Sequence, residues 1–94
     1  MVIASFASKE TERLWNRGFS RRLDHAMQTV ALRKLRMLHN AQQLGDLTAF
    51  PGNRLEALRG NRAGQWSMRI NDQWRICFRW QDNDAHQVEI TDYH

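Results

Sequence analysis

Residues 65–80 read QWSMRINDQWRICFRW, and this alternating run largely specifies the fold. Apolar side chains take every second position, and these are Trp66, Met68, Ile70, Trp74, Ile76, Phe78 and Trp80. A period of two predicts β-strands that are buried on one face. Asn71-Asp72 interrupts the run, and both residues tolerate a positive φ. We therefore predict a hairpin made of strands 65–70 and 73–80.

The opposite face of this hairpin is basic. It carries Arg69, Arg75 and Arg79, and we expect it to be solvated. Like charges on neighbouring strands repel each other. Three guanidinium groups on one face therefore indicate a surface that binds an anion.

Helical signals fill the first half of the chain. Ser8 is a predicted N-cap for a helix that runs to about Asn16 and ends near Gly18, with Glu10 and Glu12 in its first turn. Ser20 is predicted to open a longer helix from about 21 to 42, whose apolar positions follow the 3.6-residue spacing of an amphipathic helix.

The remaining segments are shorter. Residues 2–6 (VIASF) predict a strand, and residues 46–64 predict a loop with at most one turn of helix near 55–58. Residues 86–94 predict a last strand. The order β-α-α-β-β-β predicts an α+β fold, with two N-terminal helices packed on one face of a small antiparallel sheet. With 94 residues, we expect one domain spanning 1–94.

Several classes of protein are disfavoured. No apolar run approaches the roughly 20 residues that span a bilayer, and the first residues lack the basic and apolar regions of a signal peptide. The single cysteine, Cys77, rules out an internal disulfide or a cysteine-based zinc site. We find no histidine pair with metal-ligand spacing and no Gly-rich phosphate loop. We therefore expect a cytoplasmic protein with no cofactor, no metal and no membrane partner.

Charge narrows the choice of partner. Lys and Arg total 14 against 10 Asp and Glu, and 12 of the 14 are arginine. Arginine is suited to bidentate contact with phosphate. Clustered arginines favour a nucleic-acid or ribosomal partner, with an acidic protein partner and simple solubility as the alternatives.

The chain ends in Asp92-Tyr93-His94, three side chains that can transfer protons or form hydrogen bonds. His94 also carries the terminal carboxylate, and an adjacent negative charge favours the imidazolium, so we expect a raised pKa for His94. A frayed polar tail is the alternative. Val88 and Ile90 look buried, which ties the tail to the sheet that bears the arginines.

The second half of the chain resembles the HigB-type toxins of the RelE/ParE superfamily, the plasmid maintenance system killer family. The resemblance rests on LEALRGNRAGQWSMRINDQWRICFRW at 55–80 and the terminal DYH, and the first half agrees in length and order. It implies a RelE-like fold and a toxin of a type II toxin–antitoxin system. The implied activity is that of a metal-independent, ribosome-dependent mRNA endonuclease (an mRNA interferase) that inhibits translation. The implied partners are a helix-turn-helix antitoxin of the HigA type, the ribosome and mRNA, and operator DNA only through the antitoxin complex.

The same resemblance assigns site residues. Arg59 falls at a basic phosphate contact of the family and Arg75 at its active-site arginine, while Asp92, Tyr93 and His94 match its functional tail. Better-known members carry a histidine at the position of Glu56. A carboxylate there removes a cation, so we expect weaker catalysis, with Glu56 either a general base or only structural.

Chemistry and resemblance together suggest roles. RNA is cut when its 2′-hydroxyl attacks the adjacent phosphate, which needs a base, an acid and cations. We assign the cations to Arg59 and Arg75, the acid to His94 and the base to Asp92 or Glu56. Tyr93 would stack on a nucleobase or donate a hydrogen bond. Further substrate contacts are expected from Arg54, Arg62, Arg69 and Arg79. The alternatives are a non-catalytic ribosome-binding module and a gyrase-targeting toxin on the same fold.

Overall fold

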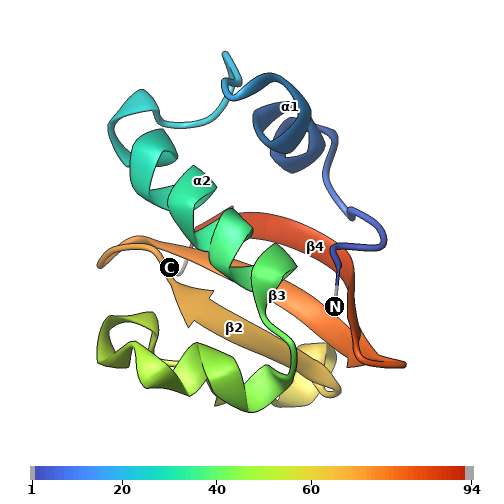
Figure 1. Ribbon diagram of the computed structural model, residues 1–94. Helices are drawn as coiled ribbons and strands as arrows, with labels where there is room; N and C mark the ends of the chain where they lie inside the picture. Colours follow the sequence, from blue (N-terminus) through green and yellow to red (C-terminus); the bar gives the residue numbers. More distant parts are fainter. Residues whose placement is uncertain (1, 93–94) are drawn as a thin grey trace.

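The structure, a computed structural model, describes residues 2–92. Helices α1 (Lys9–Arg17) and α2 (His25–Asn40) form the first half of the chain (Figure 1). Three short 3₁₀ helices and four strands follow: η1 (Leu44–Ala49), η2 (Pro51–Asn53), β1 (Glu56–Ala57), η3 (Gly60–Arg62), β2 (Gln65–Arg69), β3 (Trp74–Gln81) and β4 (Asp84–Asp92).

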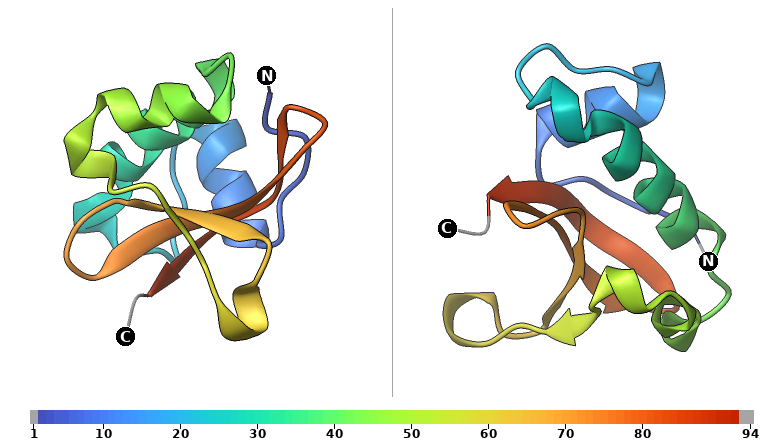
Figure 2. Two further views of the ribbon diagram at one scale, coloured as in Figure 1. Left: turned by 90° about the horizontal axis from the view of Figure 1, so that it is seen from below. Right: turned by 90° about the vertical axis from the view of Figure 1, so that its left-hand side faces the viewer.

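The strands form one antiparallel sheet in the order β1-β2-β3-β4. Both α-helices lie on one side of this sheet, and η3 lies on the other side (Figure 2). The predicted α+β arrangement, with two helices on one face of a small antiparallel sheet, is confirmed. No helix among residues 2–92 has the length and apolar character needed to cross a membrane.

The core fills the space between α2 and the sheet. Met27, Ala31, Leu35 and Leu38 supply the helix side, each with at most 1% of its surface exposed. Met68, Ile76 and Phe78 face them from the sheet and are fully buried. The predicted inner set of the hairpin is therefore confirmed, since its tryptophans also pack against this core.

The two hairpin turns are built differently. Asp82 and Asn83 link β3 to β4 with φ of 52° and 63°, the left-handed pair that a two-residue turn requires. Asn71 and Asp72 have no positive φ, contrary to the prediction from sequence. Instead, the Asn71 Oδ1 accepts hydrogen bonds from the backbone N–H groups of Gln73 and Trp74, both at 2.9 Å. The hairpin is present, but two hydrogen bonds to the Asn71 side chain stabilise its turn.

Helix α1 follows its sequence signals. The Ser8 hydroxyl accepts from the Thr11 N–H at 3.3 Å, and Gly18 ends the helix in the left-handed region with φ 77°. A glycine is favoured there because other residues rarely adopt that conformation.

Helix α2 begins later than predicted. Asp24, not Ser20, is its N-cap and accepts from the Ala26 N–H at 3.0 Å. Ser20 makes other contacts. Its hydroxyl donates to Glu10 Oε2 at 2.6 Å, its backbone N–H donates to Gln28 Oε1, and its carbonyl accepts from Gln28 Nε2. The Ser20 hydrogen bond lowers the pKa of Glu10. Residues 21–23 therefore cross between the helices as a bend.

Two other segments differ from expectation. Residues 2–6 form no strand but two isolated parallel bridges, Ile3 with Ala85 and Phe6 with Val88. In β4, Gln87 lies between Ala85 and Val88, the two residues that form these bridges. Its φ of 52° is not that of an extended strand, so the two bridges do not join into a continuous ladder. The prediction that residues 46–64 form a loop with at most one turn of helix near 55–58 is also wrong. The 3₁₀ helices η1, η2 and η3 occupy much of this segment, and Glu56 and Ala57 pair with β2 as a short edge strand.

Candidate active site

The sheet face opposite the helices is organised in cross-strand rows, because paired residues on neighbouring strands share a face. One row runs Glu56, Ser67, Cys77 and Glu89 across all four strands. The next row holds Arg69, Arg75 and Thr91. A third pairs Gln65 with Arg79. The predicted basic face therefore exists, with carboxylates placed among its arginines.

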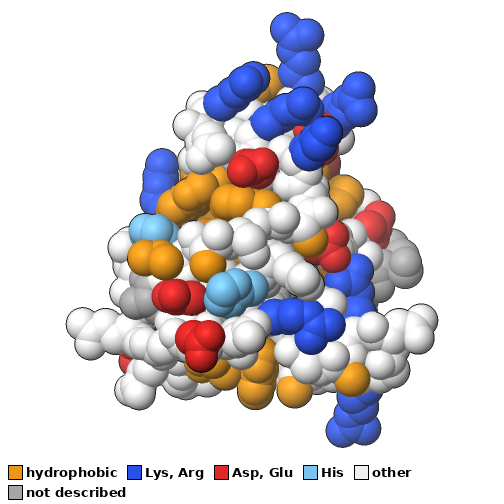
Figure 3. Space-filling view, turned by 90° about the vertical axis from the view of Figure 1, so that its right-hand side faces the viewer, with side chains coloured by type: hydrophobic (Ala, Val, Ile, Leu, Met, Phe, Trp, Pro, Cys, Tyr) orange, Lys and Arg blue, Asp and Glu red, His pale blue; other side chains and the backbone are white. Residues whose placement is uncertain are grey.

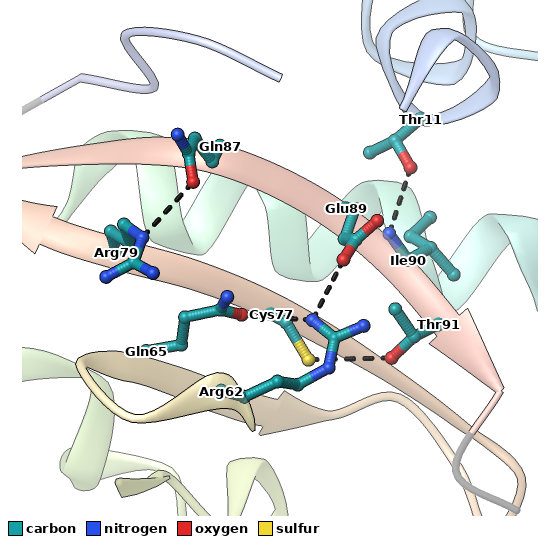
Figure 4. A network of polar contacts seen from close by, with 9 residues as sticks. All are labelled: Thr11, Arg62, Gln65, Cys77, Arg79, Gln87, Glu89, Ile90 and Thr91. Carbon is teal, nitrogen blue, oxygen red and sulfur yellow. Dashed lines mark hydrogen bonds and ion pairs between the residues drawn. The ribbon is translucent and has the colours of Figure 1, made fainter. Parts of the chain in front are cut away.

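This face is not fully solvated, which corrects the sequence prediction. Ser67, Cys77 and Arg75 expose only 0%, 4% and 8% of their surfaces. Strand β1 flanks Ser67, and the Arg62 side chain reaches over Cys77 toward β4 (Figure 4). The segment between α2 and β2 thus covers part of this sheet face.

Arg75 is the buried arginine of the face. Its Nη2 lies 3.2 Å from Glu56 Oε1 and donates to the Arg54 carbonyl at 3.1 Å. Arg54 ends η2 in the left-handed region, with φ 43°. Both contacts hold the Nη2 atom of Arg75 between Glu56 and the Arg54 backbone.

Three arginines line a small cavity at this end of the sheet. Its volume is about 230 Å³, and it is lined by Arg54, Arg69, Asn71, Asp72 and Arg75. Arg69 makes an ion pair with Asp72, whose side chain is fully exposed, so solvent screens that pair. Arg69 stands directly opposite Arg75, a repulsive placement that an anion in the cavity would relieve.

Arg62 and Arg79 are held at the other end of the face (Figure 4). Arg62 Nη1 donates to Glu89 Oε1 at 2.9 Å and to Gln65 Oε1 at 3.0 Å. The hydrogen bond to Glu89 raises the pKa of Arg62. Arg79 Nε donates to Gln87 Oε1 at 3.2 Å.

Glu89 is a site residue that the sequence prediction missed. It pairs with Cys77 across β3 and β4 and engages Arg62. Its position could have been inferred: Val88 and Ile90 face the core, so strand alternation turns Glu89 to the arginine face.

Gly64 allows Arg79 to pack against the backbone. A Cβ at Gly64 would lie 2.9 Å from Arg79 Nη1, and Gly64 has φ +89°. We expect Gly64→Ala to lower the free energy of unfolding by about 1–2 kcal/mol or more, measured by urea denaturation. Gly45→Ala is the matched control, because a Cβ at Gly45 would meet nothing within 4 Å and its φ is not positive. Equal stabilities for the two variants would contradict the packing argument.

Arg59 lies at the far end of the strands from Arg75. It precedes η3, next to Leu58, whose N–H donates to the Gln65 carbonyl at 2.8 Å. Gln65 pairs with Arg79, which is four residues along β3 from Arg75. Four strand residues span about 13 Å. The described backbone therefore groups Arg59 with Arg79, and groups Arg54 and Arg69 with Arg75.

The predicted C-terminal triad is described only in part. Asp92 ends β4 opposite Trp74 and accepts from Gln73 Nε2 at 3.1 Å. Tyr93 and His94 lie outside the described residues, so their roles stay predictions. Within residues 2–92, no group of three His, Cys, Asp or Glu side chains could hold a metal ion.

A second basic surface lies over α1 and the bend that follows it. Lys and Arg side chains gather at that end of the molecule (Figure 3). A hollow of about 500 Å³ there is lined by Glu10, Arg13, Arg17, Phe19, Ser20, Arg21 and Arg22. The basic residues that cluster in the sequence therefore lie on two surfaces, one on the sheet face opposite the helices and one over α1 and the bend that follows it.

Comparison with known proteins identifies relatives. The family model described as the RelE-like toxin of type II toxin–antitoxin system HigB matches residues 4–94. Toxin HigB-1 of Vibrio cholerae is 42% identical over 65 residues, which cover 69% of this chain and 68% of that protein. Endoribonuclease HigB of Proteus vulgaris is 28% identical over 93 residues, which cover 99% of this chain and 100% of that protein.

Solved structures show the same fold. The YoeB–YefM complex from Staphylococcus aureus matches with a TM-score of 0.60 at 18% identity, covering 100% of this chain and 99% of that chain. A YoeB/ParE toxin from Agrobacterium tumefaciens matches with a TM-score of 0.54 at 20% identity, covering 97% of this chain and 99% of that chain. The fold expected from the sequence is therefore that of known toxins.

Proposed function

Because this chain belongs to the HigB-like toxins of type II toxin–antitoxin systems, we propose that it is an endoribonuclease that cuts mRNA on the ribosome. The main support for the proposal is the cavity lined by Arg54, Arg69 and Arg75, whose positive charge suits a phosphate. The relative from Proteus vulgaris carries the name Endoribonuclease HigB, which supports the same chemistry.

The reaction uses the 2′-hydroxyl of the RNA itself as nucleophile. It attacks the neighbouring phosphorus, and the bond to the 5′-oxygen of the next nucleotide breaks. The arginines around the cavity stabilise the negative charge that develops on the phosphorane, and electrostatic stabilisation of this kind is often the dominant source of rate enhancement. Because guanidinium groups supply this charge, we propose that no metal ion is needed.

Glu56 is the carboxylate best placed to act as general base. Its Oε1 lies 3.2 Å from Arg75 Nη2, and about half of its side chain is exposed to substrate. His94 is the proposed acid that protonates the leaving 5′-oxygen, and Tyr93 is proposed to contact a nucleobase. Asp92 is the alternative proposed general base. Arg59, Arg62 and Arg79 would then contact the RNA backbone beyond the scissile phosphate.

Two further partners follow from family membership. A toxin of a type II system is neutralised by an antitoxin protein. We propose that this antitoxin is a helix-turn-helix protein of the HigA type and that operator DNA is bound only through the complex. The net charge of +4 favours an acidic antitoxin surface.

Mapping of mRNA 5′ ends after brief expression of the chain tests the activity. We expect new 5′ ends within translated regions and an early fall in protein synthesis. Expression of untranslated reporter RNA is the control, and it should yield no new ends. Double-strand breaks in DNA, with transcripts intact, would overturn the proposal and indicate a gyrase-directed toxin.

Removal of the proposed acid is the direct test of the tail. His94→Gln should abolish most growth inhibition, because a positioned proton donor contributes about 10²–10⁴-fold to the rate. The variant should still bind the antitoxin in a pull-down assay. Normal killing by His94→Gln would show that the acid lies elsewhere.

A further inference from the structure

Lys34 is a buried cation next to the arginine cavity. It lies in α2, and only 6% of its surface is exposed. No carboxylate among residues 2–92 lies within ion-pair distance of it. Burial lowers the pKa of Lys34, with smaller contributions from Arg33 and Arg69. Burying a charge without an ion-pair partner is unfavourable. The buried position of the Lys34 ammonium group therefore indicates a specific role.

The ammonium group binds two backbone carbonyls from different parts of the chain. Lys34 Nζ donates to the Arg69 carbonyl at 2.5 Å and to the Gly52 carbonyl at 3.3 Å. Arg69 is the last residue of β2, and Gly52 lies in η2. One side chain of α2 therefore joins the end of a central strand to the segment that leads to β1.

Both carbonyls belong to chain segments that carry residues of the cavity. Arg69 itself lines the cavity, and Gly52 is two residues before Arg54, which also lines it. Arg75 closes the ring by donating to the Arg54 carbonyl at 3.1 Å. The backbone positions of the three arginines are thus linked through Lys34 on one side and Arg75 on the other.

We propose that Lys34 is a positioning residue that sets the spacing of Arg54 and Arg69 for a substrate phosphate. It acts through the backbone and does not contact RNA; the inference rests on the proposed endoribonuclease function. Guanidinium groups without a bound anion repel one another, so a fixed backbone is needed to hold them ready. A misplacement of about 1 Å in such a site lowers rates by roughly 10²-fold.

Kinetics on mRNA-programmed ribosomes test the proposal with two variants. Lys34→Met keeps the length of the side chain but loses its donors and charge, and we expect kcat/KM to fall by roughly 10–100-fold. Lys34→Arg restores charge and donors and should recover most of the loss. Arg33→Met is the matched control, because it removes a positive charge from the neighbouring, exposed position. Its kcat/KM should stay within about twofold of wild type, as for other surface changes.

A double-mutant cycle separates positioning from general stability. In an Arg69→Ala background, Lys34→Met should cost about twofold at most, because without Arg69 the spacing between Arg54 and Arg69 no longer matters. The full loss in that background would overturn the proposal. So would wild-type kinetics for Lys34→Met.

Amide hydrogen exchange tests the geometry without RNA. We expect Lys34→Met, but not Arg33→Met, to speed exchange at the Asn53 and Arg54 amides, which bond to Phe50 and Pro51. Unchanged exchange at these amides would overturn the inference even if the chain cleaves mRNA. A wild-type chain that cuts no mRNA would instead refute the proposed function, and exchange would still decide the role of Lys34 in the backbone.

Discussion

Arg75→Lys is expected to lower the rate of mRNA cleavage by about 10²–10³-fold while leaving the fold intact, because it removes preorganised donors from the proposed phosphate site. Lysine keeps the positive charge but offers a point charge in place of a planar fork. Arg75 contacts both Glu56 and the Arg54 carbonyl through its Nη2 atom. A lysine ammonium on a flexible stem would lose the fixed orientation of the guanidinium group.

The measurement is single-turnover cleavage of mRNA on programmed ribosomes, with circular dichroism as the check on folding. Arg33→Lys is the control, because Arg33 is exposed on α2 and lines no part of the arginine cavity. Its rate should match wild type. A rate for Arg75→Lys within about threefold of wild type would place the chemistry at another part of the surface, since a lost preorganised donor costs far more.

Phe78→Ala is expected to lower the free energy of unfolding by about 3–5 kcal/mol, the usual cost of emptying a buried phenylalanine site. The Phe78 ring is fully buried in β3, and it packs edge-on to Trp80 with ring centroids 6.4 Å apart. Its cross-strand partner is Trp66, so the cavity would open between β2, β3 and the helices. Because small domains have a total stability of about 5–15 kcal/mol, this variant should be close to unfolded at about 37 °C.

Urea denaturation followed by tryptophan fluorescence measures this loss. Phe50→Ala is the matched control, because 52% of the Phe50 surface is exposed, and its change should stay within about 0.5 kcal/mol. Similar losses for the two variants would show that Phe78 is not a core residue. Phe78→Ala should also lose toxicity, and unlike Arg75→Lys it should lose it together with the folded state.

The fold was largely predictable because its signals are local. The alternation in residues 65–80 placed Met68, Ile76 and Phe78 in the core, and the structure confirms this. Ser8 and Gly18 marked the ends of α1. Ser20 misled the prediction for α2, because a serine before a helical pattern is equally able to bind a distant carboxylate, here Glu10.

The sequence predicted which arginines lie on the candidate active-site face, but only partly which of them lie close together. Alternation put Arg69, Arg75 and Arg79 on one face, and the strand register confirms it. The grouping of Arg59 with Arg75 rested on the family resemblance, and the backbone places Arg59 at the Arg79 end of the strands. β1 pairs antiparallel with β2, so the chain between them, which includes Arg59, lies at the end of β2 where Gln65 begins. The spacing of residues in the sequence does not indicate this pairing.

Residue order was enough to establish the α+β class, the pattern of the hairpin and the basic character of one sheet face, because periodicity assigns each strand residue to a face. What covers that face, and what supports it from behind, came from the tertiary fold. Arg62 meets Glu89, and Lys34 meets the carbonyls of Gly52 and Arg69, across 18 to 35 residues of chain. Contacts at such separations depend on how the sheet curves and how the helix lies on it, and no local pattern encodes either.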